Sequence, residues 1–240
     1  MQFFYSNNII QDENLNKVIV LDKIESNHCI NVLRYQIGDK INVVDGIGTL
    51  YQGKIKDYKK KECYIDIFKE VNNFKKRNFN IHIAIAPTKN HDRLEWFVEK
   101  AVEIGVDQIS FVNCNRSLRK QVRMNRINKV AITAMKQTLK AYLPKISSYS
   151  NLKDFINDNN TATGFICHLE DSDKKTFFDY EGIIKKEKTY VLIGPEGDFD
   201  DQEIRYAINS DVRPITLGDS RLRTETAGIV ACHLINLLNA

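Results

Sequence analysis

Residues 190–199, with the sequence YVLIGPEGDF, decide the interpretation of this 240-residue chain. The apolar run YVLI predicts a buried strand that ends directly at Gly194, the first residue of the tetrapeptide GPEG. Its two glycines let the backbone approach a ligand closely, and its proline makes the loop rigid. Asp200 and Glu203 have the spacing of a capping box for a following helix. This stretch therefore predicts a strand, a ligand-binding loop and a helix.

Residues 217–227, LGDSRLRTETA, repeat the order of strand end, glycine loop and helix start. Two such loops at one edge of a sheet predict a shared pocket. Arg221, Arg223 and Glu225 could serve that pocket, or they could form a surface ion-pair cluster. His168 lies near the carboxyl end of another expected strand, at the side where open parallel sheets bind ligands; it could serve a ligand there, or it could be satisfied within the strand terminus.

From residue 81 onward, expected strands alternate with expected helices, which predicts a parallel sheet covered on both faces. The strands are expected at 81–86, 108–113, 164–169, 189–193 and 213–217, and the helices at 92–104, 124–143, 152–157, 202–209 and 225–238. Residues 1–70 favour a small β-barrel, with strands at 18–21, 40–44, 49–55 and 63–68 and a short helical piece near 26–35. The chain is thus expected to consist of a barrel at 1–70, a linker at 71–80 and an α/β domain at 81–240.

The composition excludes several classes of protein. With 42% hydrophobic and 28% charged residues, the chain is neither disordered nor collagen-like. No apolar run is long enough to span a membrane, and the first residues lack the pattern of a secretory signal. Five scattered cysteines suggest reduced thiols in a cytoplasmic protein. No His or Cys spacing suits zinc, so no metal is expected.

The charge distribution points to a polyanionic partner. Between Asp107 and Asp154 lie 46 residues with ten Lys or Arg and no acid, where the average density predicts about six acids. A solvated helix face usually mixes both signs, so a field of one sign favours nucleic acid.

Both loops resemble the RsmE family of SPOUT methyltransferases, which methylate nitrogen-3 of a specific uridine in 16S ribosomal RNA. The resemblance is carried by IGPEG at 193–197 and by LG and LRTETA within 217–227. It continues in His28, the run Val32-Leu33-Arg34, Gly38-Asp39 and Asp45-Gly46, and in the segment from Lys89 to Val106. Asp198 and Ser220-Arg221 depart from the family pattern, which usually has a glycine after Pro-Glu-Gly.

The resemblance implies a PUA-like β-barrel followed by a SPOUT α/β domain with a carboxyl-terminal trefoil knot, a homodimer, and S-adenosylmethionine (SAM) held in the knot. The knot loops would follow Leu169, Ile193 and Leu217. The implied SAM-binding residues are Leu169, Gly194, Glu196, Gly197, Leu217, Gly218, Leu222, Arg223, Thr224 and Thr226. The expected contacts to 16S rRNA, or to the assembled small subunit, are Arg34, Arg116, Arg119, Lys120, Arg123, Arg126, Lys136 and Lys140.

Methylation at nitrogen-3 requires removal of a proton. Glu225 could be the base, or it could only cap the last helix; Arg223 or Arg221 could stabilise negative charge on the uracil. Two alternatives stay open: a SPOUT-type tRNA methyltransferase, and an RNA-binding protein without catalysis.

Overall fold

The computed structural model describes residues 2–13, 15–169, 175–185 and 188–240. Its contacts divide the chain into two units, Met1–Lys76 with Ile132–Leu143, and Arg77–Ala131 with Pro144–Ala240. The expected α/β domain of residues 81–240 is therefore interrupted, because Ile132–Leu143 groups with the first unit. Nothing in the sequence periodicity indicated that this segment would group with the first unit.

The first unit contains a six-stranded sheet with the order β1-β4-β5-β6-β3-β2. β1 and β4 pair in parallel, and the other neighbouring strands of this sheet pair in antiparallel fashion. The predicted strands are found, whereas β1 and β2, at three residues each, were too short to show a pattern. The elements are β1 Phe3–Tyr5, β2 Ile9–Gln11, β3 Lys17–Val20, α1 Lys23–Asn27, η1 His28–Val32, β4 Lys40–Val44, β5 Leu50–Lys59 and β6 Glu62–Val71.

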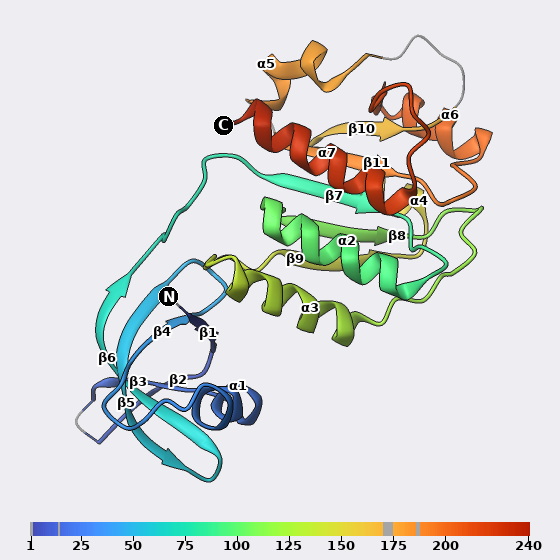
Figure 1. Cartoon of the computed structure of the whole chain (residues 1–240). Helices are drawn as coiled ribbons and strands as arrows, with labels where there is room; N and C mark the ends of the chain where they lie inside the picture. The colour runs from blue at the N-terminus through green and yellow to red at the C-terminus, as the bar shows by residue number, and fades with distance from the viewer. Residues whose placement is uncertain (1, 14, 170–174, 186–187) are drawn as a thin grey trace. The chain divides into compact units, whose positions relative to one another are not determined.

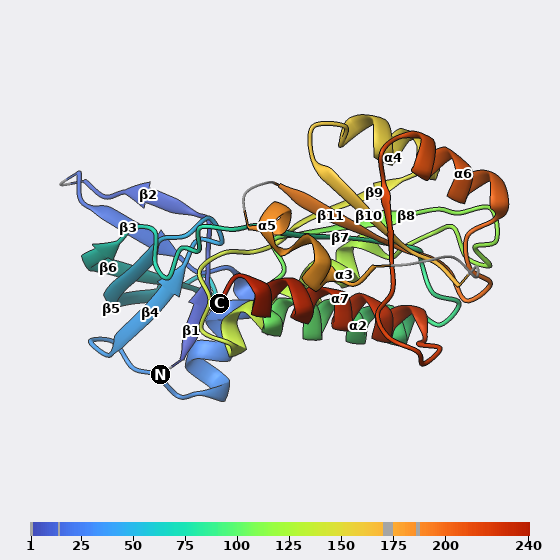
Figure 2. The ribbon, with the colours of Figure 1, turned by 90° about the horizontal axis from the view of Figure 1, so that it is seen from above.

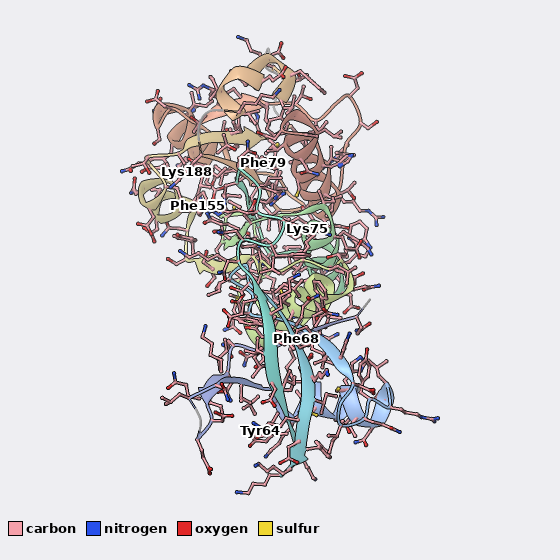
Figure 3. All side chains as sticks on the ribbon, turned by 90° about the vertical axis from the view of Figure 1, so that its left-hand side faces the viewer. Tyr64, Phe68, Lys75, Phe79, Phe155 and Lys188 are labelled. Carbon is pink, nitrogen blue, oxygen red and sulfur yellow. The ribbon has the colours of Figure 1, made fainter. Side chains whose placement is uncertain are left out.

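The turn residues, and the alternation of buried and exposed side chains along the strands, explain why this sheet forms. Asp45 and Gly46 form the turn between β4 and β5, where Asp45 Oδ1 accepts hydrogen bonds from the backbone N–H groups of Ile47 and Thr49 at 2.9 Å each. Along β6, Cys63 and Ile65 are buried in the core of the unit. Phe68 is 56% exposed, and it lies with Tyr64 along the same long strand (Figure 3).

The second unit contains an entirely parallel sheet with the order β12-β10-β11-β7-β8-β9. Figure 1 shows β10, β11, β7, β8 and β9 stacked in this order. β9 was not predicted, because its sequence KISSY is mostly polar. The strands are β7 Ile81–Ile85, β8 Gln108–Val112, β9 Lys145–Tyr149, β10 Thr163–Cys167, β11 Thr189–Ile193 and β12 Arg213–Ile215.

Helices cover both faces of this sheet, as the alternating pattern predicted. Helices α2 and α7 lie on one face and α4 and α6 on the other (Figure 2). Asn90 caps α2, and Gly105 ends it with a φ of 121°, as expected for a left-handed cap. The helical elements are α2 His91–Ile104, α3 Met124–Gln137, α4 Leu152–Asp158, the 3₁₀ segment η2 Phe177–Tyr180, α5 Glu181–Ile184, α6 Asp201–Asn209 and α7 Thr224–Leu238.

Helix α3 ends at Gln137, six residues before the predicted end at Leu143. The Thr138 hydroxyl donates to the Ala134 carbonyl at 2.7 Å, and Leu139 has a φ of 54°. A leucine in the left-handed region cannot continue a right-handed helix. No helix of the described residues is long and apolar enough to cross a membrane.

Candidate functional site

A cavity of about 280 Å³ lies at the carboxyl ends of three neighbouring strands of the second unit. The last residues of β10, β11 and β12 line it, namely Cys167, Ile193 and Ile215. The two glycine loops predicted from the sequence both line it, together with the start of α7. We call it the strand-end cavity. It lies where open parallel sheets bind ligands.

Hydrogen bonds tie the three loops of this cavity together. The Thr224 hydroxyl donates to the Gly194 carbonyl at 3.0 Å, which joins the start of α7 to the GPEG loop. The capping position of α7 belongs to Arg223, so Thr224 lies in the first turn of the helix. Asp198 Oδ2 accepts from the backbone N–H of Leu169 at 2.8 Å, which joins the GPEG loop to the end of β10. The predicted capping box of Asp200 and Glu203 is confirmed.

Asp198 has a φ of 64°, which explains why glycine is usual at this position. Asp198→Ala should weaken binding of a ligand in the strand-end cavity about tenfold, because it removes the bond to Leu169 and leaves a strained backbone. Asp198→Gly should lose the same bond without the strain, and Asp198→Asn should keep an acceptor. Calorimetric titration of SAM into the three variants measures this. Equal SAM affinities of the Asp198→Ala and Asp198→Asn variants would show that Asp198 does not position the loop through its bond to Leu169.

Most of the residues expected at the SAM site line the strand-end cavity. Gly197 and Thr226 do not. The eight that do are Leu169, Gly194, Glu196, Leu217, Gly218, Leu222, Arg223 and Thr224. Arg221, expected to stabilise charge, also lines it, and so does His168. Sequence reasoning did not assign Cys167, Pro195, Asp198 or Thr216 to the SAM site, although each lies within or beside a segment that it singled out.

Glu225, the expected base, lies in the first turn of α7 and is only 6% exposed. It lines neither the strand-end cavity nor the second cavity described below. Its Oε1 lies 3.6 Å from Arg93 Nε on α2, and its buried Oε2 has no hydrogen-bond partner among the described residues. Buried carboxylate oxygens are normally hydrogen-bonded, so an unpartnered one suits a donor that arrives with a ligand.

Arg116 holds the GPEG loop from outside. Its guanidinium donates to the carbonyls of Gly197 and Phe199 at 3.2 and 3.0 Å. Asp201 lies 3.9 Å away. Arg116 is therefore placed next to the strand-end cavity, with much of its hydrogen-bonding capacity directed to the protein.

Several cations of the segment without acids form ion pairs with acids from other parts of the folded chain. Arg126 Nε lies 2.9 Å from Glu95 on α2, and Lys136 pairs with Glu25 inside the first unit. Lys120 lines a separate cavity, while Lys140 and the exposed Arg34 belong to the first unit. The eight cations expected to contact RNA are thus divided between the two units.

A second cavity, of about 590 Å³, lies beside the start of α2, and we call it the basic cavity. Its cations are Lys89, Arg93, Arg119 and Arg123, and its acids are Asp92 and Glu196. Because Glu196 also lines the strand-end cavity, it belongs to both. Sequence reasoning had expected Arg119 and Arg123 to bind RNA but missed this cavity, although the loop after β7 starts at the same sheet edge.

Comparison with known proteins decides the family. A model of an RNA methyltransferase domain matches residues 75–236, and a model of an RNA methyltransferase PUA domain matches residues 21–68. The chain is 27% identical over 236 residues to the ribosomal RNA small subunit methyltransferase E of Buchnera aphidicola, covering 93% of this chain and 89% of that protein. The chain belongs to the RsmE family of RNA methyltransferases.

Solved structures agree with this assignment to the RsmE family. A protein of Porphyromonas gingivalis described as a probable rRNA-methyltransferase is 35% identical, with a TM-score of 0.87 over 100% of this chain and 98% of that one. A methyltransferase of Legionella pneumophila, solved with bound SAM, is 26% identical, with a TM-score of 0.86 over 98% of this chain and 96% of that one. The expected PUA-like domain and α/β methyltransferase domain are thereby confirmed.

Proposed function

We propose that the protein transfers a methyl group from SAM to nitrogen-3 of a specific uridine in 16S ribosomal RNA. The strand-end cavity is the observation that carries this proposal. It joins both family loops at one sheet edge, and the Legionella relative was solved with SAM. The name of the Buchnera relative supports small-subunit rRNA as the substrate.

The residues of the strand-end cavity fit SAM. Gly218 has a φ of 118° and no other atom within 4 Å of its missing side chain, so backbone and ligand can approach closely there. Glu196 Oε2 is buried with no partner among the described residues, and it can accept a hydrogen bond from a bound ligand. When bound, SAM supplies a methyl group on a positively charged sulfur. Leu169, Leu217 and Leu222 offer apolar contacts to it.

The remaining chemistry belongs to side chains around this cavity. Nitrogen-3 of uracil carries a proton at neutral pH, and we assign its removal to Glu225. The guanidinium groups of Arg221 and Arg223 can stabilise the negative charge that develops on the uracil carbonyl oxygens. Both arginines are exposed at the cavity, so a nucleotide can reach them. Positioning of the two reactants supplies the rest of the catalysis.

The trefoil knot and the homodimer belong to the same proposal. The loops after Ile193 and Leu217 would form the knot with the loop after Leu169, whose residues 170–174 lie outside the described part of the chain. Support comes from the bonds that join Leu169 to Asp198 and Gly194 to Thr224. Sedimentation of the purified protein tests the dimer. The PUA-like unit would add RNA contacts, among them Arg34.

Two assays separate the proposal from its alternatives. Calorimetric titration of SAM distinguishes an enzyme from an RNA-binding protein without catalysis. Transfer of a labelled methyl group to 16S rRNA, to small subunits and to total tRNA then identifies the substrate. We expect SAM binding and transfer to 16S rRNA or the small subunit. Transfer to tRNA alone would contradict the proposed substrate, and an absence of SAM binding would contradict the enzyme.

A further inference from the structure

The basic cavity has the composition of a nucleotide site. Four cations face two carboxylates in it, and the cavity volume of about 590 Å³ lies within the range of small-molecule sites, about 300–1,000 Å³. Leu118, at 70% exposure, adds an apolar surface to the same wall. Cations beside an apolar side chain suit a ligand with both a phosphate and a ring system.

Three of the four cations of the basic cavity have no acidic partner within the described residues, while Arg93 pairs with Glu225. No acidic side chain there forms an ion pair with Lys89, Arg119 or Arg123. Arg119 instead donates to neutral groups, the Lys89 carbonyl at 3.0 Å and His91 Nε2 at 2.7 Å. Burial together with the charges of Arg119 and Arg123 lowers the pKa of His91, which keeps the imidazole neutral and able to accept this bond at pH 7.

Glu196 fixes the position of the basic cavity relative to the strand-end cavity. Its Oε1 accepts a hydrogen bond from the Lys89 backbone N–H at 2.9 Å, so the GPEG loop is attached to the loop after β7. The same residue lines both cavities, which therefore share a wall. Arg93 lines the basic cavity and contacts Glu225, the assigned base.

We propose that the basic cavity binds the nucleotide to be methylated, with its phosphate on Arg119, Arg123 and Lys89 and its base directed past Glu196 towards the strand-end cavity. This assignment rests on the proposed function and identifies where its substrate enters. The cations provide charge-assisted hydrogen bonds to the phosphate, and Leu118 contacts the ribose or the base.

Arg123→Gln tests this site, with Arg205→Gln as the matched control, because Arg205 is an exposed arginine of α6 that lines neither cavity. We expect Arg123→Gln to raise KM for 16S rRNA at least about tenfold, the effect of one lost charge-assisted bond. The slope of log affinity against log salt should fall by about 1. SAM affinity should stay unchanged in both variants.

Uridine monophosphate provides a direct probe in the presence of S-adenosylhomocysteine. We expect the monophosphate to bind at least about tenfold more tightly than uridine, and Arg123→Gln to remove that difference. Equal binding of both compounds, or equal effects of the Arg123 and Arg205 variants, would overturn the proposal. Phosphate-dependent binding that needs Arg123, without methylation of 16S rRNA, would support the nucleotide site and contradict the proposed function.

Discussion

Glu225→Gln is expected to lower kcat for methyl transfer by about 10²- to 10⁴-fold, the range for loss of a general base. The amide keeps the shape of the buried side chain and leaves the first turn of α7 intact, but it cannot accept the proton from nitrogen-3. SAM affinity should change little, since Glu225 does not line the strand-end cavity. Single-turnover transfer at saturating SAM measures the chemical step alone.

Glu196→Gln is the informative comparison, because Glu196 also carries a buried oxygen without a partner among the described residues. It is expected to weaken SAM binding about tenfold while largely preserving kcat. Full activity of Glu225→Gln with unchanged SAM binding would show that Glu225 is not the base and serves only α7 and Arg93. If Glu196→Gln then loses kcat, the base is Glu196.

Gly194→Val is expected to weaken SAM binding about 10- to 100-fold. Gly194 lines the strand-end cavity, and a Cβ there would lie 3.1 Å from the Phe199 ring and 3.3 Å from Asp198 Oδ1. The added groups must displace these neighbours or fill the cavity, and overpacking of this kind costs about 1–3 kcal/mol. Titration calorimetry gives the affinity, and thermal unfolding reports whether the fold is retained.

Two further glycine variants make this result specific. Gly194→Ala should have a smaller effect in the same direction, because it adds the crowded Cβ alone. Gly182→Ala should bind SAM like the original protein, since no atom lies within 4 Å of the Cβ position there. Unchanged SAM affinity of a folded Gly194→Val variant would be incompatible with SAM in this cavity.

The sequence was sufficient to predict the parallel sheet of the second unit, except for β9, and the shared pocket of the two glycine loops. β11 is apolar and is followed directly by Gly194, while β12 is short and is followed by Gly218 three residues after Ile215, so both glycine loops are marked in the sequence. Because parallel strands place their carboxyl ends at one edge, the two loops had to meet. The buried carboxylate of Glu225 and its contact with Arg93 depend on how α7 packs against α2, which no local pattern specifies.

The segment without acids shows what a local reading of the sequence cannot predict. The absence of acids between Asp107 and Asp154 predicted a field of one sign, yet Glu95 reaches Arg126 and Glu25 reaches Lys136 from distant parts of the chain. Long-range pairing of this kind is invisible in a sequence window. The early end of α3 was also not predictable from the sequence, because the left-handed backbone conformation after it occurs at a leucine, Leu139, and not at a glycine.

Mapping 3-methyluridine in 16S rRNA from cells with and without the gene tests the central claim most directly. Mass spectrometry of rRNA fragments should find one 3-methyluridine in the small-subunit RNA when the gene is present and an unmodified uridine at that position when it is deleted. Reintroduction of the gene should restore the methyl group, and the Glu225→Gln variant should not. Identical rRNA modification in both strains, or loss of a methyl group from tRNA instead, would contradict the account.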